Sequence, residues 1–180
     1  HNTIALSRFP GSGGSNGISH WASGRQPDFR CWNNIIKASR YVVAAGASTF
    51  LADYDCLWSI DPTGRFWGNG VNASNIQGLQ QKGLELHGIE ADPGFASPPG
   101  DLTPTQGINL GASGVIDFKF IDPATGQVLV HDPIDVSYFE RALGFSGAAP
   151  DMGAIEVGGP VPRPTARFTA DPQTGVVPQP

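Results

Sequence analysis

Charged residues are scarce in this chain, at 15% of its 180 residues, and the acidic ones outnumber the basic ones to give a formal net charge of −5. A protein that binds nucleic acid needs a basic face for the phosphates, so this balance argues against such a partner. Long apolar runs are also missing. Because a membrane helix needs about 18 or more consecutive apolar residues, we expect no membrane span.

Cysteine is nearly absent, with only two copies, Cys31 and Cys56. An even number of cysteines is compatible with a disulfide if the chain is extracellular, and we leave that bond open. The spacing of the two residues supports no zinc site.

Turn-forming residues are abundant instead, with 24 glycines and 16 prolines, alongside 39% hydrophobic residues. The chain has too many apolar residues for a disordered protein and too many turn formers for a helical one. Many short strands joined by tight turns satisfy both observations, so the composition predicts an all-β fold.

Strand-like segments recur along the chain. Residues 2–7 resemble residues 34–39, which resemble residues 54–59, and a second series relates residues 17–23 to residues 41–48. Repeats at intervals of about 20 to 50 residues are typical of solenoids.

In-and-out alternation along such strands predicts rows of inward side chains. We expect one row of Ile4, Ile36 and Cys56, and a second row of Leu6, Ala38 and Trp58. A coil buries its apolar face only against neighbouring coils. The first coil is therefore expected to expose Ile4 and Leu6 and to offer a surface for self-association.

Other local elements are less numerous. Residues 75–83 predict one short helix with Asn75 as its cap, and residues 137–144 predict a second. Residues 118–130 predict a hairpin, because Pro123 and Gly126 stand where its turn needs them.

Residues 53–58, 79–95 and 150–156 resemble the last coils of pectate-lyase-like right-handed parallel β-helix proteins, and residues 33–36 are similar to the Asn-rich strand starts of that family. These matches run in order over about residues 1–157. The resemblance implies the C-terminal coils of a right-handed parallel β-helix, a solenoid, in a secreted or cell-surface protein.

For function, the same resemblance implies a carbohydrate-active protein that binds a polysaccharide or cell-surface glycan, with lyase or glycoside hydrolase activity in the full-length protein. A non-catalytic structural or adhesion module of an extracellular protein is the alternative, because a fold does not fix a function.

The C-terminal end differs in character. Residues 158–165 form a Gly- and Pro-rich linker. Residues 166–180 resemble the first strand of a PKD-type module, which implies an extracellular multidomain protein. We expect this extended tail to pack poorly on the preceding coils.

The candidate catalytic residues are Lys37, Arg40, Asp53 and Asp55. Lys37 and Arg40 could serve as the base and the cation that a lyase needs beside a uronate, or could be solvated strand edges. Asp53 and Asp55, two residues apart in a strand, would share one face and could bind Ca²⁺ or raise each other's pKa. Alternatively, one of them replaces a strand-start Asn.

Trp67, Arg65 and Trp21 are the candidates for carbohydrate binding, since an aromatic face can stack on a sugar ring. Trp67 and Arg65 lie in a Gly-rich stretch expected to be a surface loop, although half of the tryptophans in a solenoid must face the core.

Structural roles are expected for the remaining polar residues of these motifs. His87 is predicted to lie in a turn that closes a coil, and Asp92 and Asp151 are predicted to be turn or cap carboxylates. Asn33 and Asn34 are predicted to satisfy backbone groups at the coil corners.

Overall fold

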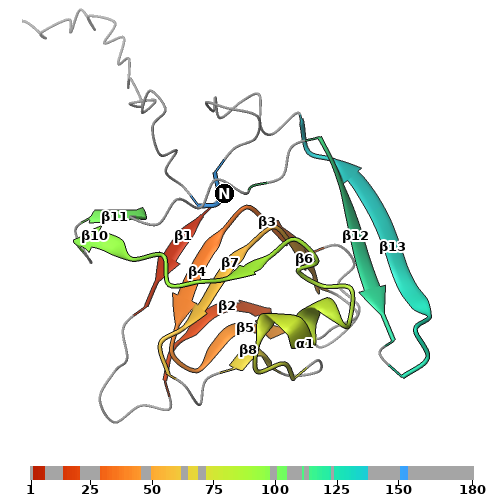
Figure 1. The fold of residues 1–180 in the computed structure, drawn as a ribbon, viewed down its shortest axis with the longest axis horizontal. Helices are drawn as coiled ribbons and strands as arrows, with labels where there is room; N and C mark the ends of the chain where they lie inside the picture. The colour runs from red at the N-terminus through yellow and green to blue at the C-terminus, as the bar shows by residue number, and fades with distance from the viewer. Residues whose placement is uncertain are drawn as a thin grey trace, which may run out of the picture.

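The fold is given by a computed structural model (Figure 1). The structure describes residues 2–6, 14–20, 29–45, 50–61, 65–68, 72–97, 101–104, 111, 114–122, 124–137 and 151–153. Within these ranges the protein is all-β, with thirteen strands and one short helix. The composition-based prediction of an all-β fold is confirmed at that level.

The first nine strands form three sheets, and all their pairings are parallel. Sheet 1 contains β1 (Thr3–Ala5), β4 (Ile35–Ala38), β7 (Cys56–Ser59) and β9 (Ile89–Glu90). Sheet 2 contains β2 (Asn16–His20), β5 (Tyr41–Ala45) and β8 (Arg65–Gly68). Sheet 3 contains β3 (Phe29–Trp32) and β6 (Phe50–Asp53), which completes the nine.

The chain visits these sheets in a fixed order. Strands β1, β2 and β3 enter sheets 1, 2 and 3 in turn, and β4, β5 and β6 repeat the cycle on top of them. Strands β7 and β8 then begin a third cycle. The two series of repeats found in the sequence therefore correspond to sheets 1 and 2.

The register of sheet 1 is partly as expected. Ile4 pairs with Ile36, as predicted. In the next row, however, Ile36 pairs with Leu57, and Cys56 pairs with Ile35. The predicted row of Ile4, Ile36 and Cys56 is therefore wrong by one residue at β7, and Trp58 lies beside Lys37 rather than Ala38.

The main core lies between the three parallel sheets and extends to the hairpin β12–β13. Its fully buried members include Ile36, Phe50, Leu57 and Phe118. Burial of each such side chain contributes about 1.5–3 kcal/mol before the entropy cost of folding is counted.

The outer face of sheet 1 carries a second, smaller core. Ile35 and Cys56 are both fully buried there beneath Met152, and Phe95 packs against them. Both faces of sheet 1 are therefore covered in this region, and neighbouring residues along β4 and β7 are buried alike.

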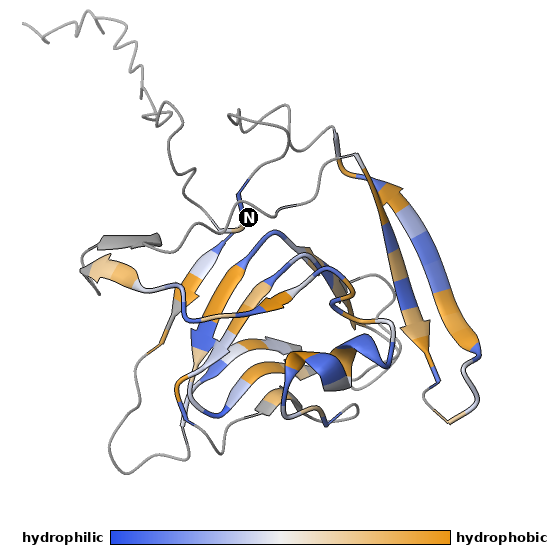
Figure 2. Cartoon of the chain, in the orientation of Figure 1, coloured by the Kyte–Doolittle hydropathy of each residue, from blue (hydrophilic) through white to orange (hydrophobic). Residues whose placement is uncertain are grey.

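Two antiparallel hairpins stand beside the parallel sheets (Figure 1). Strands β10 (Phe95–Ser97) and β11 (Asp101–Pro104) form one, and β12 (Val115–Ile121) and β13 (Val128–Asp135) form the other, next to β6. In Figure 2 the second hairpin shows alternating apolar and polar bands, which match buried Ile116 and Phe118 on one face of β12. The hairpin predicted at residues 118–130 is confirmed and is longer than expected.

The helix α1 (Ile76–Gln80) confirms the first helix prediction. Its cap is Asn75, whose side-chain oxygen accepts the Gly78 N–H at 2.9 Å. The helix predicted at residues 137–144, the linker 158–165 and the PKD-like strand 166–180 lie outside the described residues, apart from Ser137.

Candidate functional site

A ladder of polar side chains runs along the start of sheet 1, exposed at Asn2 and buried at Asn34 and Asp55. Asn2, Asn34 and Asp55 each stand just before a strand, at one level of the register. The Oδ1 atom of Asn34 accepts the backbone and side-chain N–H groups of Asn2 at 2.9 and 3.0 Å. Asp55 Oδ1 in turn accepts the corresponding groups of Asn34 at 2.7 and 2.8 Å. The predicted Asn stacking and the replacement of one Asn by Asp are both present.

The fourth position of this polar ladder is filled in a different way. Gly88 is level with Asp55, but it has no side chain, and Glu85 reaches into its place. A Cβ atom on Gly88 would lie 2.4 Å from Glu85 Oε2. That same oxygen accepts the Asp55 N–H at 3.1 Å. Glu85 itself has a φ of 52°, in the left-handed region.

Two carboxyl groups are therefore buried next to each other. Burial raises the pKa of Asp55 to about 6, while the hydrogen bonds from Asn34 act in the opposite direction. Burial, together with the Asp55 charge, raises the pKa of Glu85 well above its ordinary value. We conclude that Glu85 is the group that holds a proton, because two like charges this deep in the protein are costly and the N–H groups of Asn34 stabilise the charged form of Asp55.

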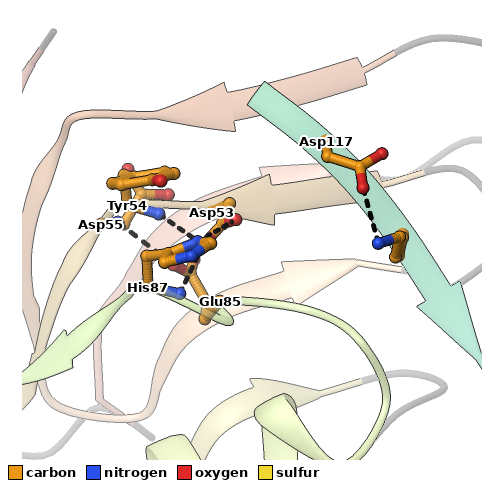
Figure 3. A network of polar contacts seen from close by, with 7 residues as sticks. Asp53, Tyr54, Asp55, Glu85, His87 and Asp117 are labelled. Carbon is orange, nitrogen blue, oxygen red and sulfur yellow. Dashed lines mark hydrogen bonds and ion pairs between the residues drawn. The ribbon is translucent and has the colours of Figure 1, made fainter. Parts of the chain in front are cut away.

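Asp53, which is buried, takes part in a second network with the exposed side chain of His87 (Figure 3). Its Oδ1 accepts the backbone N–H groups of Tyr54 and His87 at 2.9 and 2.7 Å, and its Oδ2 lies 2.9 Å from His87 Nδ1. The His87 ring stacks on Tyr54 with 4.4 Å between ring centroids. The Asp53 carboxylate can only accept a hydrogen bond. The neutral His87 ring therefore carries its proton on Nδ1, and its Nε2 is left as an acceptor.

This arrangement corrects the prediction for the two aspartates. Tyr54 has a φ of 60°, so Asp53 and Asp55 flank a turn between β6 and β7 rather than sharing one strand face. Asp53 binds His87, whereas Asp55 binds Asn34. His87 lies in a turn, as predicted, and its backbone bond to Asp53 ties that turn to the end of β6.

The basic candidates are engaged elsewhere. Lys37 Nζ lies 2.7 Å from Asp92 Oδ1 and 5.8 Å from the centre of the Phe95 ring. The Arg40 guanidinium lies 5.1 Å from the centre of the Tyr41 ring. Among the described residues, no hydrogen bond or ion pair joins Lys37 or Arg40 to Asp53 or Asp55. Asp92 also accepts the Gly94 N–H at 3.0 Å, which confirms its predicted turn role.

A cavity opens at the far end of β7. It has a volume of about 270 Å³ and is bordered by residues of β7, β8 and β9 and of the segments that follow β7 and precede α1. Its lining residues are Trp58, Ser59, Ile60, Asp61, Phe66, Ser74 and Glu90. This volume is close to the lower end of the range of roughly 300–1,000 Å³ typical of ligand sites.

The polar groups of this cavity are partly unengaged. Glu90 Oε2 accepts the Ile76 N–H at 3.1 Å, while its Oε1 receives no hydrogen bond from any described residue. The indole N–H of Trp58 and the hydroxyl of Ser74 likewise have no partner within the described part of the chain. The cavity therefore offers an aromatic surface, two donors and an acceptor to a ligand.

None of the carbohydrate-binding residues named from the sequence is among the described lining residues of this cavity. The structure gives the backbone of Arg65 and Trp67 in β8 but not their side chains, and Trp21 lies outside the described residues. Trp58 and Glu90 were missed because they are 32 residues apart in the sequence and meet only through the pairing of β7 with β9.

The cysteines do not form a disulfide. Both are buried free thiols, with Cys31 in sheet 3 and Cys56 in sheet 1. Burial raises the pKa of each thiol, to about 12 for Cys56.

In the described ranges, no group of three or more His, Cys, Asp and Glu side chains is arranged to hold a metal ion. No described helix is long and apolar enough to span a membrane.

No family model, curated protein or solved structure matches the chain. The candidate site is therefore defined by its own geometry alone.

Proposed function

We propose that the chain is part of a secreted or cell-surface protein that binds a polysaccharide on the outside of a right-handed parallel β-helix. The chain passes through sheets 1, 2 and 3 in the same order in successive cycles, and the strands of each cycle pair in parallel with those of the cycle before. This arrangement supports a helical coil. Crossover connections between parallel strands of one sheet are almost always right-handed, which gives the handedness.

The observation that carries the binding function is the cavity beside Trp58. A sugar ring combines an apolar face with a rim of hydroxyl groups, and it needs an aromatic surface together with donors and acceptors. Trp58 supplies the aromatic surface, Ser74 a hydroxyl, and Glu90 a carboxylate oxygen. Lys37 pairs with Trp58 across the sheet, so further contacts could follow the outer face of sheet 1.

Binding is better supported than catalysis in this part of the protein. Lys37 is paired with Asp92, Asp53 is bound by three N–H groups, and Asp55 is buried. A non-catalytic binding or adhesion module is therefore our preferred form of the proposal.

One observation favours glycoside hydrolase activity in the full-length protein as a second candidate. Asp61 and Glu90 line the same cavity, and most glycosidases use two carboxyl groups that flank the scissile bond.

The test is a binding titration of the purified chain with soluble oligosaccharides, comparing wild type with Trp58→Ala. Losing the aromatic surface should weaken binding about tenfold, which corresponds to about 1.4 kcal/mol. Leu129→Ala, an exposed apolar truncation on β13, is the control and should leave binding unchanged.

Equal binding by wild type and Trp58→Ala would contradict the assignment of the site. Running the titration in Ca²⁺ and in chelator tests whether Ca²⁺ contributes to binding.

A further inference from the structure

The resemblance to pectate-lyase-like proteins implies an acidic, uronate-containing ligand, but the charges around the cavity favour the opposite sign. We propose that the cavity beside Trp58 selects an amino-sugar polysaccharide, whose ammonium groups it binds, over a polyuronate. This inference rests on the proposed polysaccharide-binding function and specifies its ligand.

The described wall of the cavity is acidic. Two of its seven described lining residues, Asp61 and Glu90, are acidic, and none of these seven is basic. A uronate carboxylate placed in this space would meet like charges at close range, while an ammonium group would meet opposite ones. The net charge of −5 on the chain acts in the same direction at longer range.

One oxygen of the Glu90 carboxylate is available to a ligand in the described structure. Its Oε2 is held by the Ile76 N–H, which fixes the carboxylate at the edge of the cavity. Its Oε1 has no donor among the described residues and remains able to accept one from a ligand. An ammonium donor would form a charge-assisted hydrogen bond there, which is stronger than the bond that a neutral hydroxyl forms.

One described cation, Lys37, lies on the same face of sheet 1 as Trp58. Lys37 lies beside Trp58 in the register, where it could have attracted a uronate. Its ammonium group is instead paired with Asp92 at 2.7 Å. Lys37 is therefore largely neutralised and does not reverse the charge of the cavity.

The experiment compares three oligosaccharides of equal length with the purified chain: a β-1,4-linked glucosamine oligomer, a cello-oligosaccharide and an oligogalacturonate. We expect the glucosamine oligomer to bind at least tenfold more tightly than the oligogalacturonate at low salt, with the neutral oligomer in between. Added salt should reduce the differences in affinity among the three oligomers, because the preference is electrostatic.

Glu90→Gln tests the residue itself. It keeps an oxygen for the Ile76 N–H but removes the charge, so glucosamine binding should weaken about tenfold while binding of the neutral oligomer changes little. Asp117→Asn on β12 is the matched control, with the same change in net charge on a residue outside the cavity, and it should leave the preference intact.

The outcomes separate the two claims. Tightest binding of the oligogalacturonate, or an equal effect of Glu90→Gln and Asp117→Asn, would overturn the amino-sugar inference alone. Binding of none of the three oligomers would overturn the proposed function and the inference with it.

Discussion

The buried pair of Asp55 and Glu85 should make the fold less stable as the pH rises. In the unfolded chain these carboxyl groups lose their protons near their ordinary pKa values of 3.8 and 4.5. In the folded protein both pKa values are raised, so the folded state binds more protons than the unfolded state above about pH 4. The free energy of unfolding is therefore greatest at low pH for this pair and falls as the pH rises through 6.

The size of the effect follows from Asp55, which is wholly buried. A pKa raised from 3.8 to about 6 corresponds to about 3 kcal/mol, since each pH unit is worth about 1.4 kcal/mol. Glu85 extends the loss of stability to higher pH, because its pKa is raised further. A loss of about 3 kcal/mol is a large fraction of the 5–15 kcal/mol that stabilises a typical domain.

The substitution Glu85→Gln tests whether the protonated carboxyl group of Glu85 causes this pH dependence. The glutamine keeps an oxygen for the Asp55 N–H, and its amide N–H₂ can donate to Asp55 Oδ2, which has no hydrogen-bond partner in the described structure. We expect the variant to match wild type near pH 4.5, to exceed it by roughly 2–3 kcal/mol at pH 8, and to show a flatter dependence on pH.

Urea unfolding at pH 4.5, 6 and 8, followed by tryptophan fluorescence, measures these differences. Asp117→Asn, which removes an exposed carboxylate, controls for the general effect of one charge. A wild-type stability that does not fall between pH 4.5 and 8, or a Glu85→Gln variant that is less stable than wild type at pH 8, would refute the assignment of the retained proton to Glu85.

Two further predictions concern neighbouring buried groups. Gly88→Ala should destabilise the protein by about 2 kcal/mol or more, because the new methyl group collides with Glu85. Combining this change with Glu85→Ala should recover part of the lost stability. Urea unfolding of the single and double variants measures the coupling between the two residues. The Cys56 thiol should react with a thiol reagent such as DTNB only on unfolding, because it is buried with a pKa of about 12; rapid reaction of the native protein would contradict this burial.

The local elements that begin or turn at characteristic capping and turn residues could be predicted from the sequence alone. Asn75 marks the start of α1, and Gly126, with a φ of 70°, lies in the turn of the hairpin β12–β13. Each of these signals acts within a few residues, so long-range packing has little power to override it.

The register of β7 could not be predicted from apolar alternation, and the reason is physical. Ile35 and Ile36 are both fully buried, as are Cys56 and Leu57, because Met152 and Phe95 cover the outer face of sheet 1. A strand buried on both faces carries no period-2 signal, and a shift by one residue then leaves the apolar pattern equally satisfied.

The polar ladder determines the register where hydrophobic residues do not. A shift by one residue would place Asp55 away from Asn34 and leave buried hydrogen-bond donors without an acceptor, which costs more than an imperfect apolar contact. The same register sets Trp58 beside Lys37 and Glu90 beside Leu57, and so positions the cavity at the other end of β7. The ladder and the proposed ligand site are therefore linked through β7, a strand of only four residues. Substitutions of Asp55 that alter the pairing of β7 should also change the position of Trp58 and weaken ligand binding.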